Sequence, residues 1–262
     1  MDFLKGEGKI KMNKINIFII CFIQFSFMLS LVEAKTADEW YNEGVYSGQS
    51  GKYNEAIIAY DEALKINPQY ADVWNNKGIA LKKLKRYEEA IKSYDEALKI
   101  NPLYSQAFYN KGLALANLKR YEEAITAYNE SLKITPQYAQ AWYDKGLALA
   151  TQTNYKEAIK AYDEALKINP KYVDAWYNKG IALANLNRHE KAIKAYEEVL
   201  RINPQHADAW YKKGTSLANL KKYEEAIKAN DEANKLQKTP WFIIIFVFAG
   251  LILITYLLKR KR

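Results

Sequence analysis

The sequence feature that most constrains the fold is a glycine that returns every 34 residues along most of the chain. The glycines of this series are Gly44, Gly78, Gly112, Gly146, Gly180 and Gly214. Five prolines keep the same step, namely Pro68, Pro102, Pro136, Pro170 and Pro204. A fixed period of this length is typical of stacked, near-identical supersecondary units, each of which contacts only its neighbours. We therefore expect a solenoid and not a single globular core.

One period predicts two helices and two turns. In the second period, residues 71–104, Trp74, Gly78 and Leu81 fall at helical spacing, and the second half repeats this spacing around Tyr94. The pair Asn101-Pro102 ends the second helix, because proline disfavours the α conformation of the residue before it. A glycine inside a helix costs about 1 kcal/mol relative to alanine. Its recurrence therefore predicts a close approach of the two helices.

These positions resemble the tetratricopeptide repeat (TPR), a family with an aromatic residue at position 4, Gly at 8, Ala at 20, an aromatic at 24, Ala at 27 and Pro at 32. The second period matches with Trp74, Gly78, Ala90, Tyr94, Ala97 and Pro102. The resemblance implies an all-α, right-handed α-solenoid of antiparallel helix pairs, the TPR superhelix. It covers residues 37–238 as six repeats, at 37–70, 71–104, 105–138, 139–172, 173–206 and 207–238. One departure recurs: a lysine replaces the usual leucine before the glycine in five periods, and its stem can cover apolar surface.

Two apolar segments flank the repeats. Residues 1–34 combine early lysines, an apolar run and small residues before a cleavage point after Ala34, which predicts a signal peptide, or else an uncleaved N-terminal anchor. Residues 241–258 carry no charge and match the thickness of a bilayer, which predicts a transmembrane helix and completes the expected fold class. The basic residues 259–262 then predict a cytoplasmic tail. A sorting signal for a surface transpeptidase is the alternative, although the usual motif before such a signal is missing.

Charge, cysteine and histidine argue against several classes of function. Of the net charge of +9, only +4 falls on residues 35–240, where basic and acidic residues are interspersed, so we expect no nucleic-acid partner. The basic run 82–86 is interpreted as a solvated helix end. Cys21 is the only cysteine, and His189 and His206 replace tyrosines of other periods, which predicts packing roles. We expect no catalytic residue, no metal and no cofactor, and hence no enzyme.

In the family that the chain resembles, the first helix of each repeat lines a concave groove that binds peptides. The resemblance implies a partner-binding groove of tyrosines and amides at positions 5, 6 and 13 of the period. Its predicted residues are Tyr109, Asn110, Asn117, Tyr143, Tyr177, Asn178, Asn185 and Tyr211. Tyrosine offers a large rigid surface, and an amide can hydrogen-bond a peptide backbone. The alternative is that the tyrosines only pack against neighbouring helices.

These features predict a membrane-anchored scaffold that binds a protein or peptide partner through its groove. The predicted location is the cell membrane, with a single span, extracytoplasmic repeats and a cytoplasmic C-terminus. Two alternatives stay open: an accessory subunit of an envelope assembly, secretion or glycosylation complex, and a structural spacer without a specific ligand. The richness in Lys, Ile, Asn and Tyr favours a prokaryotic source.

Overall fold

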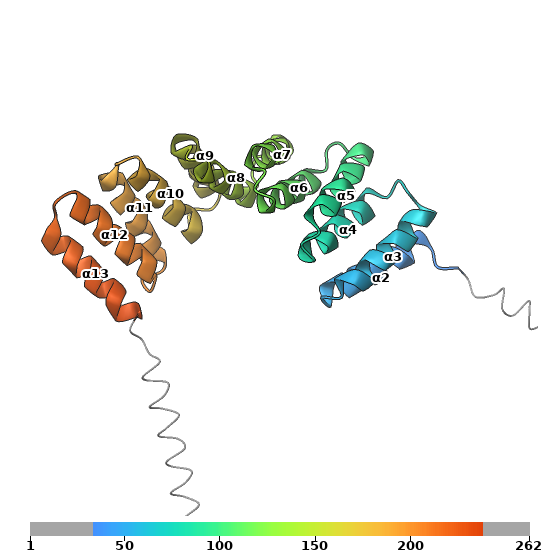
Figure 1. The fold of residues 1–262 in the computed structure, drawn as a ribbon, viewed down its shortest axis with the longest axis horizontal. Helices are drawn as coiled ribbons and strands as arrows, with labels where there is room; N and C mark the ends of the chain where they lie inside the picture. The colour runs from blue at the N-terminus through green and yellow to red at the C-terminus, as the bar shows by residue number, and fades with distance from the viewer. Residues whose placement is uncertain (1–33, 238–262) are drawn as a thin grey trace, which may run out of the picture.

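A computed structural model of the chain describes residues 34–237, and this part is built of helices in tandem pairs (Figure 1). The first helices of the pairs are α2 (Ala37–Gln49), α4 (Ala71–Lys83), α6 (Ser105–Asn117), α8 (Ala139–Thr151), α10 (Val173–Asn185) and α12 (Ala207–Asn219). The second helices are α3 (Tyr53–Ile66), α5 (Tyr87–Ile100), α7 (Tyr121–Ile134), α9 (Tyr155–Ile168), α11 (His189–Ile202) and α13 (Tyr223–Gln237). The all-α solenoid expected from the period is confirmed.

The turn within each pair closes the first helix in the same way. In the second pair, the Arg86 N–H donates to Leu81 O and the Lys85 N–H donates to Lys82 O, both at 2.9 Å, which is the Schellman arrangement. This arrangement requires a left-handed residue at position 15 of the period. Only the first period has glycine there, Gly51, and the others use Lys85, Lys119, Thr153, Asn187 and Lys221, with φ between 56° and 61°.

Within a pair, the recurrent glycine lets the two helices approach closely. The ring of Tyr128 from α7 lies over Gly112 of α6, and Tyr128 is only 1 % exposed. The alanines at positions 20 and 27, such as Ala90 and Ala97, are fully buried beside these contacts. The last pair differs, because Asn230 takes the place of the tyrosine and faces Gly214. Among the described residues, the buried Oδ1 of Asn230 has no hydrogen-bond donor.

Successive pairs are joined by the tryptophan and the lysine of each first helix. The indole N–H of Trp176 donates to Pro170 O, which precedes α10, at 3.0 Å. The ammonium of Lys179 lies 4.6 Å from the Trp176 ring centroid and forms an ion pair of 2.6 Å with Asp163 of α9. Equivalent ion pairs join Lys77 to the first pair and Lys213 to the fifth. The lysine that departs from the family pattern is therefore a link between neighbouring pairs.

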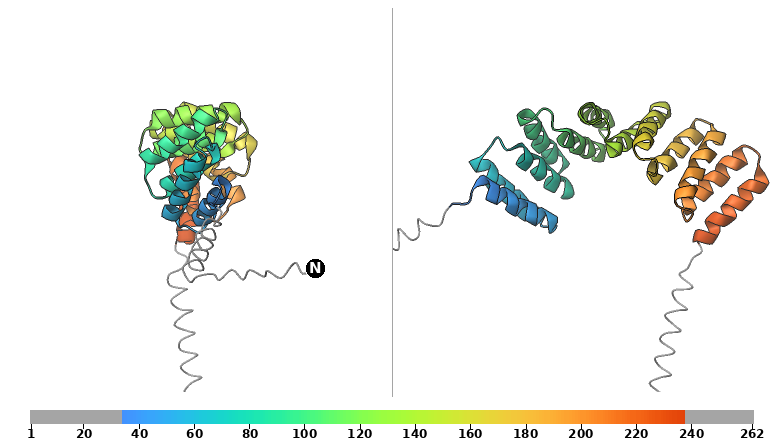
Figure 2. Two further views of the ribbon diagram at one scale, coloured as in Figure 1. Left: turned by 90° about the vertical axis from the view of Figure 1, so that its right-hand side faces the viewer. Right: turned by 180° about the vertical axis from the view of Figure 1, so that it is seen from behind.

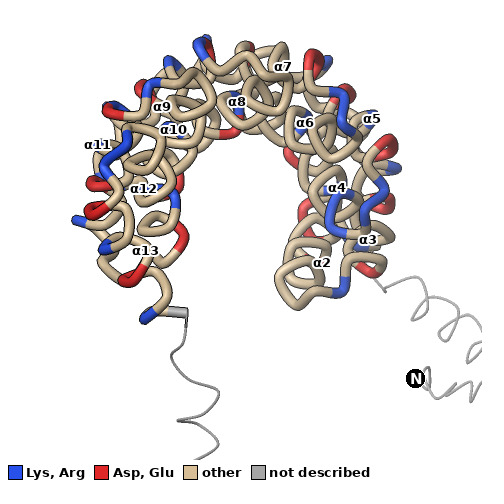
Figure 3. The backbone as a smooth tube through the Cα atoms, turned by 60° about the vertical axis from the view of Figure 1, so that its left-hand side comes forward, with Lys and Arg blue, Asp and Glu red and all other residues tan. Residues whose placement is uncertain are grey.

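The stack of pairs curves into an arch, which Figure 2 shows from behind and from one end. In Figure 3 the helices α4, α6, α8, α10 and α12 lie on the inner side of the arch, while α3, α5, α7, α9 and α11 lie on the outer side. From the second pair onward, each first helix packs against its own partner and against the second helix of the preceding pair. The first helices therefore line the concave face.

The predictions of a transmembrane helix and of a location in the cell membrane are corrected by the structure. We expected a transmembrane helix at 241–258 and a single-pass location in the cell membrane. None of the helices that the structure describes between residues 34 and 237 has the length and apolar character to cross a bilayer. These helices have 13 to 15 residues, whereas a span needs about 20 apolar ones. The predicted signal peptide, span and basic tail fall almost entirely on residues 1–33 and 238–262, which lie outside the described part.

Candidate partner-binding groove

The predicted groove residues lie on α6, α8, α10 and α12, on the inner side of the arch (Figure 3). The structure places them in three environments. Tyr109 and Asn110 are buried, with exposures of 8 % and 4 %. Tyr143, Tyr177 and Asn178 are half-buried, and Asn117, Asn185 and Tyr211 are exposed. Their role in binding a partner stays a prediction, but their present contacts can be stated.

The tyrosines at position 5 of the third, fourth and fifth periods each pack between two other aromatic rings. The Tyr109 ring centroid lies 6.0 Å from that of Tyr128 and 4.7 Å from that of Tyr138, with the rings tilted. Tyr143 and Tyr177 repeat this arrangement, although His206 replaces one of the rings around Tyr177. Tilted aromatic pairs at these distances contribute about 0.5–1.5 kcal/mol each. These groove tyrosines are therefore part of the packing between pairs.

Polar contacts run between neighbouring first helices along the same face. The Asn178 amide donates to the Tyr143 hydroxyl at 3.1 Å, and the Tyr109 hydroxyl donates to Asp144 Oδ2 at 2.8 Å. Asn117 and Asn185 instead donate to carbonyls of their own helices, at 2.8 Å and 3.0 Å. The side-chain oxygens of these two exposed asparagines can accept a hydrogen bond from a ligand. Tyr211 is 54 % exposed and has the most accessible ring of the predicted set.

The middle of the groove contains a cluster that the other periods lack. We call it the groove cluster, and its members come from three adjacent helices. They are Asn75 and Lys82 of α4, Tyr109 and Asn110 of α6, and Gln140 and Asp144 of α8. Three of them are specific to their period. Asn75 stands where other periods have tyrosine, Lys82 where four later periods have alanine, and Asp144 where four others have asparagine.

Hydrogen bonds connect the members of the groove cluster. The Asn110 side chain donates to Asn75 Oδ1 at 3.2 Å and accepts from Lys82 Nζ at a long 3.4 Å. Asp144 Oδ2 accepts from Tyr109 at 2.8 Å and from Gln140 Nε2 at 3.2 Å. Lys82 and Asp144 are both half-buried. Among residues 34–237, neither of them forms an ion pair with a side chain of opposite charge.

Burial disfavours the charge of both groups. Removal from water, with a smaller effect of Lys83, lowers the pKa of the Lys82 ammonium to about 8, although Asp144 attracts its charge. Burial also raises the pKa of Asp144, which the hydrogen bonds from Tyr109 and Gln140 oppose. At neutral pH the groove cluster thus presents a cation and an anion, neither of them fully compensated. Such a pair can bind side chains of opposite charge on an extended segment.

The sequence interpretation missed this cluster. Lys82 was assigned to a solvated basic run, whereas its amine reaches Asn110 on the next first helix. The available signal was the substitution pattern within the period, since Lys82 stands where four later periods have alanine. Asp144 gave the same kind of signal, because four other periods have asparagine at its position.

Comparisons with known proteins agree with this architecture. Family models described as tetratricopeptide repeats match residues 49–85, 71–104, 93–126, 112–153, 143–207 and 177–237, which together span 49–237. The fold and its groove define a repeat scaffold for protein–protein interaction. The chain belongs to the tetratricopeptide repeat family. The division into six repeats of 34 residues stays a prediction.

Several solved structures are similar to this chain. YrrB, described as "a TPR protein with an unusual peptide-binding site", is 25 % identical, with 69 % of this chain and 93 % of YrrB covered and a TM-score of 0.63. MamA is also 25 % identical, with coverages of 62 % and 94 % and a TM-score of 0.60. The pilF protein of Pseudomonas aeruginosa is 18 % identical, with coverages of 78 % and 93 % and a TM-score of 0.64, and this likeness concerns the fold alone. Among curated protein sequences, none matches the chain.

Proposed function

We propose that this chain is a non-catalytic scaffold whose concave groove binds an extended segment of a protein partner. The observation that carries the proposal is the groove cluster, where Lys82 and Asp144 depart from the residues of the other periods and stay half-buried without an ion pair among the described residues. Burying a charge without a partner is unfavourable. A ligand that supplies the opposite charges offsets this unfavourable energy. The groove cluster is therefore suited to binding a charged ligand.

The chemistry of the cluster describes the segment that would fit. An acidic side chain of the partner would pair with Lys82, and a basic side chain would pair with Asp144. The exposed amide oxygens of Asn117 and Asn185 would accept hydrogen bonds from backbone N–H groups farther along the groove. A peptide-binding site on YrrB, a protein of the same fold, supports this class of ligand. The packed tyrosines at position 5, Tyr109, Tyr143 and Tyr177, would mainly keep the groove rigid.

The test is a selection of peptides from a random display library on the full chain, followed by rebinding to a variant. The double variant Lys82→Ala with Asp144→Asn installs the residues that most other periods carry at these positions, so we expect it to fold. A control variant, Lys228→Ala with Asp231→Asn, makes the same charge changes on exposed residues of α13. Circular dichroism checks that both variants keep their helix content.

We expect the selected peptides to combine acidic and basic side chains. Their affinity should fall about tenfold or more in the double variant, because charge-assisted contacts are lost, and it should stay unchanged in the control. Equal binding to the wild type and the double variant would reject the groove cluster as the recognition site. Failure to select any peptide would argue against a groove that binds extended segments.

A further inference from the structure

The fifth period contains a substitution that lies outside the groove. Position 19 of the period, near the start of each second helix, is glutamate in five periods and Lys191 in the fifth. In the other periods this glutamate forms an ion pair with a base three residues away. The pairs are Lys52–Glu55, Arg86–Glu89, Arg120–Glu123, Lys160–Glu157 and Lys222–Glu225.

The change to Lys191 also removes the glutamate that pairs with one neighbouring base in each of the other periods. Arg188 stands three residues before Lys191, at the position of Arg86 and Arg120, and Lys194 stands three residues after it, at the position of Lys160. Within residues 34–237, none of the three forms an ion pair with a carboxylate, although the exposed Glu190 is adjacent in sequence. Three positive charges without an ion pair among the described residues therefore gather at the start of α11, with Arg188 just before the helix and Lys191 and Lys194 on its first two turns.

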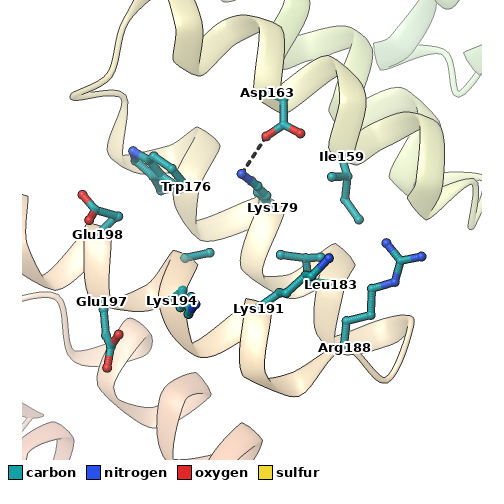
Figure 4. A pocket seen from close by; sticks show the side chains of 11 residues that line it. Ile159, Asp163, Trp176, Lys179, Leu183, Arg188, Lys191, Lys194, Glu197 and Glu198 are labelled. Carbon is teal, nitrogen blue, oxygen red and sulfur yellow. Dashed lines mark ion pairs between the residues drawn. The ribbon is translucent and has the colours of Figure 1, made fainter.

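These three bases line a pocket of about 560 Å³ between α9, α10 and α11 (Figure 4). The carboxylates of the pocket are already neutralised by other bases. Asp163 pairs with Lys179 at 2.6 Å, Glu197 with Lys213 at 2.8 Å, and Glu198 with Arg201 at 2.8 Å. The pocket therefore has an excess of positive charge.

The charges are unevenly placed around the pocket. In Figure 4, Arg188 and Lys191 lie at one end beside Leu183 and Ile159, while Glu197 and Glu198 lie at the opposite end. The positive end therefore has apolar side chains beside its charges, although Arg188, Lys191 and Lys194 are themselves exposed to solvent. The helices α9 and α11 are on the outer side of the arch, so this pocket is separate from the groove (Figure 3).

We infer that this pocket is a second interaction site, which binds an acidic segment of a protein that carries an apolar side chain beside its carboxylates. The carboxylates would pair with Arg188, Lys191 and Lys194, and the apolar side chain would contact Leu183 and Ile159. Nucleic acid fits less well, because its backbone needs a longer basic surface than two helical turns. The inference goes beyond the proposed function and does not depend on the groove.

Fluorescence anisotropy tests the inference with two labelled peptides and the full chain. The first probe is the capped pentapeptide Glu-Glu-Phe-Glu-Glu, and the second is Lys-Lys-Phe-Lys-Lys. The decisive variant is Lys191→Glu, which restores the glutamate of the other five periods and offers an ion-pair partner to Arg188 and Lys194. Because five periods already carry this residue, we expect the variant to fold. The control Lys119→Glu makes the same charge change at an exposed turn two periods away.

We expect the acidic peptide to bind the wild-type chain, more weakly as salt increases, and the basic peptide not to bind. Lys191→Glu should weaken binding by about tenfold or more, since charge-assisted contacts are lost, whereas Lys119→Glu and the groove double variant should leave it unchanged. The inference fails if the acidic peptide does not bind, or if it binds Lys191→Glu as well as wild type. It also fails if a single-stranded oligonucleotide, and not the acidic peptide, loses affinity in Lys191→Glu.

Discussion

A Cβ atom placed on Gly112 would lie 2.5 Å from Cε1 of Tyr128, closer than nonbonded carbon atoms can approach. The same contact between glycine and tyrosine recurs in the five pairs from α2–α3 to α10–α11. The tyrosine ring is buried and held by the helices on both sides, so it cannot move away freely. The glycine period of the sequence therefore reflects a steric requirement of the helix pair.

Replacement of Gly112 by alanine should therefore destabilise the chain. Overpacking a tight core site costs about 1–3 kcal/mol, and this exceeds the roughly 1 kcal/mol that alanine gains over glycine in a helix. We expect a net loss of up to about 2 kcal/mol in the free energy of unfolding, measured by urea titration with circular dichroism. The control is Gly48→Ala in α2, where the nearest atom to a new Cβ is 3.8 Å away. That variant should be more stable than the wild type; a loss in both variants would contradict the steric explanation.

The fold was largely predictable from the sequence because its main contacts repeat. Glycine recurs at position 8, tyrosine at position 24, alanine at positions 20 and 27 and proline at position 32, and their spacing predicted the helix pairs and the close approach at Gly112. The left-handed turn residue was not predictable in this way. Lys85, Thr153 and Asn187 share no chemical property that signals φ > 0, and the surrounding helices impose the conformation.

Thr153→Gly should stabilise the chain. Thr153 has φ of 59°, a conformation that is costly for a β-branched residue, and its side chain is exposed. Relief of about 1–2 kcal/mol of strain exceeds the entropy that glycine adds to the unfolded state, so we expect a gain of about 0.5–1 kcal/mol. Asn187→Gly should gain less, because asparagine tolerates this conformation better. Equal effects of the two variants in urea titrations would show that β-branching is not the cause.

Asn129→Asp should add a missing link between pairs. Lys77, Lys111, Lys179 and Lys213 each pair with an acid of the preceding second helix, but Lys145 faces the position of Asn129 and lacks such a partner within residues 34–237. Burial lowers the pKa of Lys145, and a new carboxylate would favour its charged form. We expect a gain of about 0.5–1 kcal/mol at neutral pH, smaller in high salt. A gain that persists unchanged below about pH 3, where the introduced carboxyl group is protonated, would exclude an ion pair as its source.

The groove was predictable only in part. The resemblance gave the concave face and its tyrosines, but it gave no means of telling which tyrosines are enclosed by packing. Tyr109 is buried between two rings, whereas Tyr211, at the same position of the period, is mostly exposed because no later pair within the described residues covers it. Lys82 was missed because its burial depends on α6 and α8, which approach it only in the folded arch.

Lys82→Ala should stabilise the chain at neutral pH and remove a pH dependence. Burial and, to a smaller extent, the neighbouring Lys83 lower the pKa of Lys82 from 10.5 to about 8, although Asp144 opposes this shift. Between about pH 8 and 10.5 the unfolded chain therefore binds more protons than the folded chain, so wild-type stability rises with pH. Below about pH 8 both states hold the proton, and the unfavourable burial of the charge is fully present. The variant, which has the alanine of later periods, lacks this burial and should be more stable by about 1–2 kcal/mol at pH 7.

The measurement is the free energy of unfolding of wild type and Lys82→Ala between about pH 7 and 9.5, where the tyrosines of the unfolded chain ionise equally in the two proteins. The difference between the two proteins should shrink as the pH rises, because the wild type then loses the buried charge. The control Lys83→Ala removes the neighbouring exposed lysine and should show no such trend beyond a slight upward shift of the Lys82 pKa. If the difference in the free energy of unfolding stays constant across this range, the Lys82 amine is solvated. The groove cluster would then contain no buried, uncompensated cation.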